Sequence, residues 1–425
     1  MNESYLQYIW KLRRIPIKNL FTTDGEKITI HNFGWHNLDP GPDFFNGQIE
    51  IANLKWSGNI EIHVKSSDWY LHKHQNDDSY NNVILHVVYE HDKEVVVNGE
   101  IIPTLELQDK IDKEHFEAYC QLTKSPNKIP CSGHKPYDDL AIFQQLTVAL
   151  IERGNRKAKE LEEVFLNCGK SLIHVLHYAL FSAFGGRVNK SAFQQLANAI
   201  SYSILLKESS EKVKIEALLF GIAGFLDDHY PHPYQDSLIR EWSFLKHKYN
   251  LNSMPVSVWK FGGVRPSSFP TIKIAQLAQF IFEWKYNTNW KNDKPVEIIQ
   301  NFDSLLSTAS SPFWKTHYTF DKTSKSLHKP CMSNRAKQSI VINAAVPYLW
   351  FLGTEKKEEA YVQKAVDILE ILPSECNKVI TDWKDLGVLS KNAADSQSLL
   401  EQKNQFCTFR RCLVCKIGYK ILAKS

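Results

Sequence analysis

The feature that most constrains the fold is a change in hydrophobic periodicity near Pro130. Before this point, short runs alternate between apolar and polar residues, which is the period of a strand with one buried face. After it, apolar residues recur at helical spacing over long segments. Because the two patterns are segregated along the chain, the sequence predicts an α+β protein. We expect an N-terminal α/β domain with a mixed sheet, followed by a large all-helical region.

The individual elements follow from these patterns and from the breaks between them. The strands are expected at 27–31, 48–51, 59–65, 83–90 and 94–97, after a helix at 3–14. The longer helices are expected at 138–167, 191–206, 213–225, 272–284, 358–371 and 391–403. The expected domains are 1–115 and 136–425, and the connector 116–135 carries Cys131. A length of 425 residues fits two or three domains.

Composition and charge exclude several classes of protein. Hydrophobic residues make up 43% of the chain and charged residues 23%, which is typical of a folded core and excludes extended disorder. The net charge of +4 is too small to indicate a nucleic-acid partner by itself, although residues 401–425 hold six basic residues and one acidic residue. No apolar run has the length of a membrane span, and the N-terminal basic residues follow the apolar ones, the reverse of a secretory signal. We therefore expect a cytoplasmic protein with no membrane partner.

Acidic residues cluster around a predicted hairpin. If the chain reverses near Ala52, positions whose numbers sum to about 105 face each other, which places Asp43 beside Glu61 and His63. Glu61, His63 and Lys65 share one face of their strand, because side chains alternate. Two carboxylates beside a basic side chain suit a magnesium or manganese ion and an attacking water. The alternative interpretation is a hairpin with a solvated polar face.

These residues resemble the PD-(D/E)XK nuclease superfamily. Pro42-Asp43 precedes the hairpin and Glu61-x-His63 follows it, as the two parts of that motif do. The resemblance implies a restriction-endonuclease-like fold with a helix, a β-meander, a second helix and a further strand. It also implies that Asp43 and Glu61 bind the metal and that the protein is a metal-dependent phosphodiesterase acting on DNA. The motif expects lysine at position 63, where this chain has histidine, so His63 or Lys65 would position the water.

A second metal site is an alternative. His72 and His74 are two residues apart and would face the same side in an extended segment, where they could bind zinc together with Asp68, or with Asp68 and His86. A zinc hydrolase is therefore a rival hypothesis. His86 itself lies in an apolar run, which is more typical of a core histidine.

Cysteines form another constellation near the C-terminus. Cys407, Cys412 and Cys415 lie within nine residues and can bind a zinc ion or an iron–sulfur cluster. The expected fourth ligand is Cys131, with Cys331 and Cys376 as alternatives. The competing interpretation is a helix at 406–420 whose cysteines are partly core.

This arrangement is similar to iron–sulfur nucleases of the same superfamily, the CRISPR adaptation exonucleases and the helicase-linked nucleases. In those enzymes one distant cysteine and a C-terminal group of three hold a cluster. The spacing differs here, and Cys131 follows the nuclease motif, whereas their first cysteine precedes it. The residues expected to contact a nucleic-acid backbone are Arg265, in a loop with aromatic residues and glycines, and Arg410 and Arg411.

A wider pattern extends over nearly the whole chain. Its parts are Gly41-Pro42-Asp43, Glu61-Ile62-His63, Asp68-Trp69, Leu85-His86-Val87-Val88, Trp259-Lys260, Arg265-Pro266 and the cysteine-rich end. This pattern resembles an uncharacterised bacterial family that is designated only as a domain of unknown function, and it implies no activity. Because the expected lysine is missing, a second hypothesis is an inactive nucleic-acid-binding or scaffolding protein.

Overall fold

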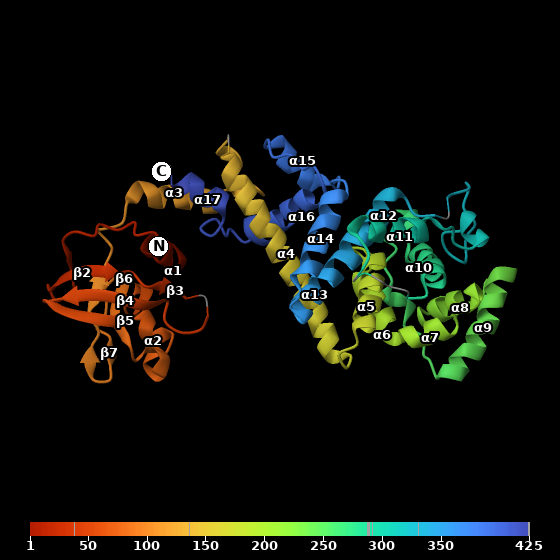
Figure 1. Cartoon of the computed structure of the whole chain (residues 1–425), viewed down its shortest axis with the longest axis horizontal. Helices are drawn as coiled ribbons and strands as arrows, with labels where there is room; N and C mark the ends of the chain where they lie inside the picture. Colours follow the sequence, from red (N-terminus) through yellow and green to blue (C-terminus); the bar gives the residue numbers. More distant parts are fainter. Residues whose placement is uncertain (38, 136, 287–289, 291, 330, 424–425) are drawn as a thin grey trace. The chain divides into compact units, whose positions relative to one another are not determined.

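The computed structural model describes residues 1–423 except 38, 136, 287–289, 291 and 330 (Figure 1). Lys424, one of the six basic residues at 401–425, lies outside the described residues. The chain divides into two compact units: Met1–Gln145 with Lys403–Ser425, and Leu146–Gln402. The division differs from the expected one because the C-terminal segment returns to the N-terminal unit. The predicted fold class is confirmed, since a mixed sheet near the N-terminus is followed by a mostly helical region.

The first unit is built on a mixed sheet in the order β1-β2-β4-β5-β6-β9, with β3 paired to β4. Its strands are β1 Leu20–Phe21, β2 Lys27–Asn32, β3 Trp35–His36, β4 Phe44–Ile51, β5 Leu54–Lys65, β6 Val83–Glu90 and β9 Thr104–Glu106. The pairs β2·β4 and β4·β5 are antiparallel, whereas β5·β6 and β6·β9 are parallel. A separate ribbon pairs β7 Val96–Val97 with β8 Glu100–Ile101.

The hairpin between β4 and β5 has the predicted register over most of its length. Ala52 and Asn53 both adopt positive φ, 49° and 67°, as a two-residue hairpin turn requires. Residues pair with a constant sum from Ile51 and Leu54 back to Gly47 and Gly58, which confirms the prediction. The register then shifts by one before Phe44 pairs with Ile60. This β-bulge near Asn46, whose φ is 57°, brings Asp43 level with Glu61.

A crossover joins β5 to the parallel strand β6. Parallel neighbours cannot be joined by a tight turn, so the chain leaves the end of β5 and returns through three short helices. These are α2 Asp68–Leu71, η1 His74–Asn76 and η2 Asp78–Tyr80. The crossover therefore places its side chains next to the C-terminal half of β5.

Three helices of the first unit are joined by contacts between aromatic residues. Helix α1 (Glu3–Lys11) stacks Tyr5 on Tyr119 of α3 (Lys113–Lys124), with ring centroids 4.8 Å apart. Tyr8 of α1 meets Tyr419 of α17 (Lys416–Leu422) edge to face at 6.5 Å. Arg14 donates a hydrogen bond to the Leu422 carbonyl, which also ties the C-terminal segment to the N-terminal one.

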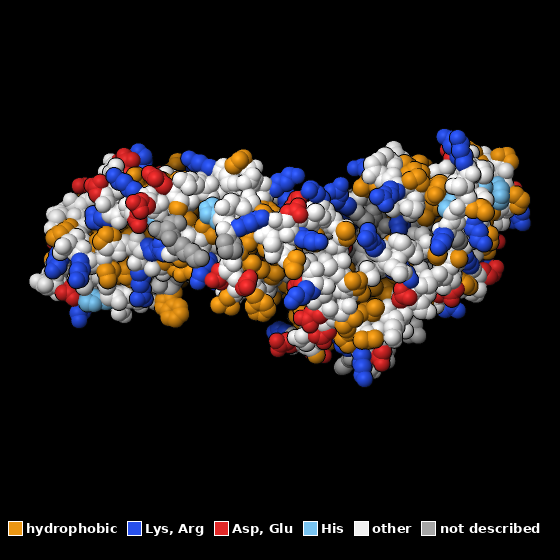
Figure 2. Space-filling view, turned by 90° about the horizontal axis from the view of Figure 1, so that it is seen from above, with side chains coloured by type: hydrophobic (Ala, Val, Ile, Leu, Met, Phe, Trp, Pro, Cys, Tyr) orange, Lys and Arg blue, Asp and Glu red, His pale blue; other side chains and the backbone are white. Residues whose placement is uncertain are grey.

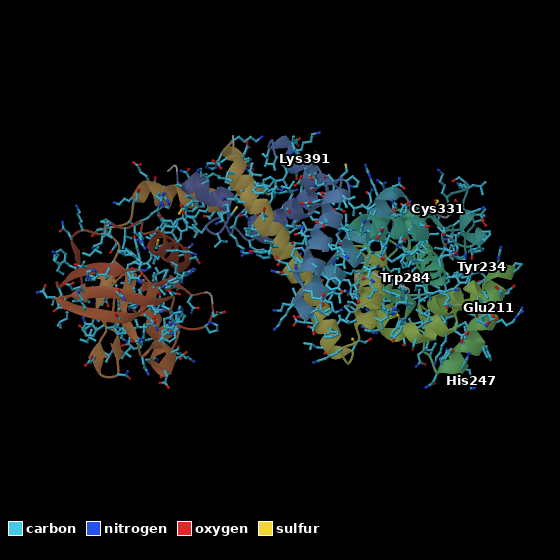
Figure 3. The ribbon with its side chains drawn as sticks, viewed as in Figure 1. Glu211, Tyr234, His247, Trp284, Cys331 and Lys391 are labelled. Carbon is cyan, nitrogen blue, oxygen red and sulfur yellow. The ribbon has the colours of Figure 1, made fainter. Side chains whose placement is uncertain are left out.

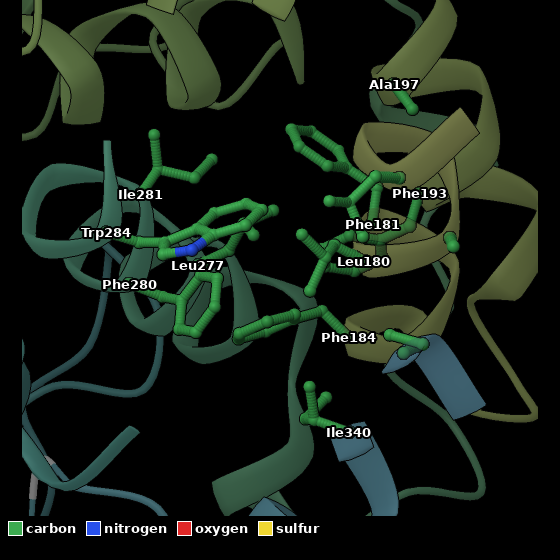
Figure 4. Close-up of a cluster of buried hydrophobic side chains, with 14 of the residues drawn as sticks. Leu180, Phe181, Phe184, Phe193, Ala197, Leu277, Phe280, Ile281, Trp284 and Ile340 are labelled. Atoms are coloured by element: carbon green, nitrogen blue, oxygen red, sulfur yellow. The ribbon is translucent and has the colours of Figure 1, made fainter. Parts of the chain in front are cut away.

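The second unit is helical. After α4 Asp139–Asn167, which enters it from the first unit, its helices are α5 Leu172–Gly185, α6 Lys190–Ala199, α7 Tyr202–Lys207, α8 Lys212–Ile222, α9 Pro233–Tyr249, α10 Pro270–Trp284, α11 Pro295–Ser307, α12 Asn334–Ile340, α13 Val346–Lys356, α14 Glu359–Ile371, α15 Lys378–Asp385 and α16 Ala393–Glu401. The helix expected at 191–206 is divided in two because Ile200 is extended and Ser201 caps α7 by accepting from the Ser203 amide. In the core of this unit, α5 and α6 pack against α10 and α12. Phe181 and Phe184 of α5 and Trp284 of α10 are among the buried side chains (Figure 4). Among the described residues, no helix combines the length and the apolar character needed to cross a bilayer.

Candidate metal centre

The crossover brings three histidines together at the end of β5. His63 lies on β5, and His72 and His74 flank the short step from α2 to η1. Lys73, between these two, adopts a left-handed conformation with φ of 64°. The two histidines thus reach the same site through a turn, which is neither the helix nor the extended segment considered from the sequence. Among the described residues, these three form the group of ligand atoms that all lie within 4.8 Å of one another.

Pairs of donor atoms have the spacing of ligands around one metal ion, and Glu61, which is outside the group of three, contacts two of its histidines. His63 Nε2 lies 3.2 Å from His72 Nδ1. Glu61 Oε1 lies 3.4 Å from His74 Nε2 and 3.6 Å from His63 Nε2. Bonds of about 2.0–2.1 Å to a tetrahedral zinc ion would place neighbouring ligand atoms about 3.3 Å apart. The three measured edges lie close to that value.

Glu61 is held so that one oxygen faces the histidines. Its Oε2 accepts a hydrogen bond of 3.0 Å from the backbone amide of Asp43 at the start of β4. This contact fixes the orientation of the carboxylate. Its other oxygen, Oε1, therefore points toward His63 and His74. The bulge in β4, which brings Asp43 level with Glu61, is therefore part of the construction of the site.

A buried layer stands behind the histidines. His63 Nδ1 is hydrogen-bonded to Nε2 of His86, which is fully buried on β6. The buried Trp69 ring meets His63, His74 and His86 edge to face, and Tyr80 stacks on His74 with centroids 3.8 Å apart. His72, in contrast, is exposed. The site is therefore rigid on one side and open to solvent on the other.

Asp43 forms a second carboxylate group beside Glu61. Its Oδ2 accepts from the Ile62 amide at 3.1 Å, and its Oδ1 accepts from Gln7 Nε2 at 2.8 Å. Gln7 also donates to Glu3 one turn earlier on α1. The sequence analysis missed Glu3 and Gln7, although a partly buried acid and amide four residues apart on an apolar helix face are a usable signal.

The electrostatics of the site favour a bound cation. Burial raises the pKa of Asp43, and burial with the charge of Asp43 raises the pKa of Glu61. Burial lowers the pKa of His74 to about 4 and, with the neighbouring His86, His74 and His72, that of His63 to about 2. The imidazoles of His63 and His74 are thus neutral, which is the state that binds metals. The buried Nε2 of His74 has no hydrogen-bond partner in the described part of the chain, so a ligand position is left unsatisfied.

The donor set decides which metals fit. Three imidazoles and one carboxylate suit zinc, iron or manganese, whereas magnesium prefers oxygen ligands throughout. The residues fit a first-row transition metal, and Asp43, one hydrogen bond away, offers a further oxygen.

The remaining residues of the predicted hydrolase sites have other contacts. The Lys65 ammonium is half exposed and lies 3.3 Å from Glu90. Asp68 accepts a hydrogen bond from the Lys65 amide, which fastens the start of α2. His86 contacts the site through His63. The structure thus merges Glu61 and His63 of one predicted site with His72 and His74 of the other.

The arginines predicted to bind nucleic acid are divided between the units. Arg265 lies in the second unit, at the exposed start of η5 Pro266–Ser268. In the first unit, Arg410 donates to the carbonyls of Cys407 and Ser125, and Arg411 stacks over Phe406. The face of this unit seen in Figure 2 mixes basic and acidic side chains. These contacts give Arg410 and Arg411 structural roles.

The predicted cysteine ligands meet in the first unit. Cys131, Cys407, Cys412 and Cys415 are all buried there. Cys331, labelled in Figure 3, and the exposed Cys376 belong to the second unit.

Fold and site together define an α+β protein whose mixed sheet carries a candidate centre for a transition metal. The chain matches, over residues 3–378, the family described as "Protein of unknown function (DUF2851)", and it belongs to that family. Neither the curated proteins nor the solved structures include a match to it.

Proposed function

We propose that this protein is a metal-dependent hydrolase that cleaves phosphodiester bonds in DNA. The observation that carries the proposal is the position of Glu61 Oε1, which lies 3.4 Å and 3.6 Å from the ring nitrogens of His74 and His63. Three imidazoles grouped at a solvent-accessible edge, with room for water beside them, are typical of a catalytic metal centre, and Glu61 stands next to two of them. We propose zinc or manganese as the metal, in place of the magnesium that Asp43 and Glu61 alone would favour.

The topology supports phosphodiester chemistry. Helix α1, the meander β2-β4-β5, the crossover helix α2 and the parallel strand β6 follow one another in the order implied by the resemblance to PD-(D/E)XK nucleases. Asp43 stands at the start of the middle strand and Glu61 on the next. These are the positions that carry the acidic residues of the motif.

The surface beside Asp43 supports a nucleic-acid substrate. Strand β3 pairs Trp35 with Phe45, and the Asn37 amide donates to the Asp43 carbonyl. Trp35 is 73% exposed and Phe45 36% exposed, so two solvent-accessible aromatic side chains lie on the paired strands next to Asp43. Lys11 lies 3.4 Å from His36 on the same strand as Trp35. Exposed aromatic side chains near a cation can stack bases and contact phosphates.

Each residue of the candidate metal centre has a proposed role in the hydrolysis. When bound, the metal would act as a Lewis acid on the phosphate oxygen. Glu61, His63, His72 and His74 would hold it, and the His86 hydrogen bond would keep His63 oriented. Asp43 still has acceptor capacity beyond its two hydrogen bonds, so it is placed to orient a water molecule and accept its proton. No disulfide joins the described cysteines, which fits the cytoplasmic location that we propose.

The test is hydrolysis by purified protein with zinc, manganese or magnesium. The substrates are bis(p-nitrophenyl) phosphate and labelled single- and double-stranded DNA. We expect activity with zinc or manganese, and a loss of at least about 100-fold in Glu61→Gln and Asp43→Asn. His31→Ala, an exposed histidine on β2, is the matched control and should keep full activity. Activity that survives Glu61→Gln would refute the proposal.

One observation favours a second function. Lys65, which could stand in for the missing lysine, is paired with Glu90, and four ligands that close a metal site are typical of structural centres. The second candidate is therefore a nucleic-acid-binding or scaffolding protein with a structural metal. It predicts that the wild type binds one metal ion and retards DNA in a gel but cuts none of the substrates.

A further inference from the structure

Four buried cysteines from two distant segments meet in the first unit. Cys131 lies in η3 (Pro130–Gly133), Cys407 ends the π-helical turn η8 (Gln402–Cys407), and Cys412 and Cys415 lie in the loop before α17. Each is at most 8% exposed. The other described cysteines are intermediate or exposed, so these four stand apart as the buried thiols of the described chain.

Hydrogen bonds hold the two segments in place. Arg410 donates from Nη1 to the Cys407 carbonyl at 3.0 Å and from Nη2 to the Ser125 carbonyl at 2.8 Å, so it links the C-terminal loop to the end of α3. The Lys416 amide donates to Gln145 Oε1 at 2.7 Å, and Tyr137 donates to the Cys131 carbonyl at 3.1 Å. The cysteine loop is thus fixed against the end of α3 and against α4, and Tyr137 holds the η3 segment that carries Cys131.

The two cysteine segments lie against the same helix. Helix α3 contacts both η3, which holds Cys131, and α17, which follows Cys415. Cys131 interacts electrostatically with Cys415 and Cys412, and Tyr137, which donates to the Cys131 carbonyl, interacts with Cys407. The four cysteines therefore belong to one neighbourhood of the first unit.

Their spacing is wider than a single ion allows. Zinc–sulfur bonds of about 2.3 Å in a tetrahedron would hold the sulfur atoms about 3.8 Å apart. Among the described residues, three ligand atoms all within 4.8 Å of one another occur at the histidines and not at these cysteines. An iron–sulfur cluster holds its cysteines farther apart, because its own iron and sulfide atoms occupy the centre.

We propose that Cys131, Cys407, Cys412 and Cys415 bind a 4Fe–4S cluster that fastens the C-terminal segment to the first unit. Arg410, at the rim of the site, provides positive charge that offsets the negative charge of four thiolates. The cluster lies outside the histidine centre and takes no part in the proposed hydrolysis, so either proposal can fail without the other.

The test is metal analysis of full-length protein purified without oxygen. We expect roughly four iron and four sulfide ions per chain and a broad visible absorption band that bleaches on reduction with dithionite. Cys131→Ser and Cys412→Ser should each lose most of the iron and sulfide. Cys376→Ser, in the second unit, is the matched control and should keep the wild-type content.

Two results would overturn the assignment. One is wild-type protein that carries zinc but no iron at these cysteines, with the zinc lost in Cys131→Ser. The other is an iron and sulfide content that Cys131→Ser leaves unchanged. If Cys412→Ser proves insoluble, the wild-type analysis and Cys131→Ser still decide between these results.

Discussion

His63 Nδ1 lies 2.8 Å from Nε2 of His86, and both side chains are buried. This hydrogen bond links adjacent parallel strands and fixes the ring of His63, so that its Nε2 points toward His72. Hydrogen bonds of this kind orient a metal-binding histidine and select its tautomer. His86 is thus a positioning residue for the candidate centre, although it contributes no ligand atom of its own.

The first prediction concerns His86. Replacing it by alanine should weaken zinc binding about 10- to 100-fold, because His63 loses its orientation while all four ligands remain. His86→Gln keeps a polar group and should restore part of the affinity. The measurement is competition titration of zinc with a chromophoric chelator. An unchanged affinity in His86→Ala, with His72→Ala strongly impaired, would show that His86 only fills space.

The second prediction concerns the aromatic pair beside the site. Trp35→Ala should raise KM for single-stranded DNA about 5- to 150-fold, because one stacked base contributes about 1–3 kcal/mol. Hydrolysis of bis(p-nitrophenyl) phosphate, which has no bases, should be unchanged. Trp56 on β5 is 41% exposed and is the matched control. Equal effects of Trp35→Ala on both substrates would indicate a disturbed site and refute base stacking.

The sequence predicts the parts of the candidate site that depend on strand pairing. The turn at Ala52-Asn53 sets the register as far as Gly47, and the one-residue shift at the bulge near Asn46 then brings Asp43 beside Glu61. Alternation along β5 places Glu61 and His63 on one side, and the structure has their side chains 3.6 Å apart. Local rules are sufficient for the hairpin and for the shared face of Glu61 and His63, whereas a turn and a period of two do not define the shift at the bulge.

The joining of the two histidine groups could not be predicted in this way. His72 and His74 reach His63 because Lys73 adopts a left-handed conformation, which a lysine rarely does and which no local pattern signals. The return of the C-terminal segment to the first unit is also a tertiary effect. It depends on contacts such as Tyr8 with Tyr419, between residues that are far apart in the sequence.

The cysteine segment shows a similar limit. Its apolar spacing at 406–420 is compatible with a helix, but the chain forms the turn η8, a loop, and then α17. The loop contains Cys412, so this cysteine can point toward Cys131 rather than follow the face of a helix. Tertiary contacts of the loop, such as Arg410 with the Ser125 carbonyl and the Lys416 amide with Gln145, have overridden helical periodicity there.

The third prediction concerns pH and Lys273 on α10. Burial lowers the pKa of this lysine to about 8, and its ammonium donates a hydrogen bond to Gln276 one turn away. Between pH 8 and the unfolded pKa near 10.5, the unfolded chain binds more protons than the folded one. The free energy of unfolding should therefore rise with pH in this window and be lowest below pH 8.

Comparison with Lys273→Met isolates that contribution from other groups that titrate in the same range. At pH 7 the variant should be more stable by on the order of 2 kcal/mol, and the difference should disappear toward pH 10.5. The measurement is urea denaturation at several pH values, followed by tryptophan fluorescence. A wild type that is more stable than Lys273→Met at pH 7 would contradict the prediction.

The last prediction concerns Gly418 on α17. A β-carbon at this position would overlap the carbonyl oxygen of Cys412, so α17 can pack on the cysteine loop only without a side chain there. Gly418→Ala should destabilise the first unit by about 1–3 kcal/mol, because either the helix or the loop must move. Gly133→Ala, beside Cys131, is the matched control, since a β-carbon there would have nothing within 4 Å. Denaturation and amide hydrogen exchange of α17 would measure both effects.

If the loop is held by the cluster as proposed, Gly418→Ala should also lower the iron content, whereas Gly133→Ala should leave it unchanged. Equal stability and equal exchange in the two variants would mean that the contact between α17 and the loop does not stabilise this unit.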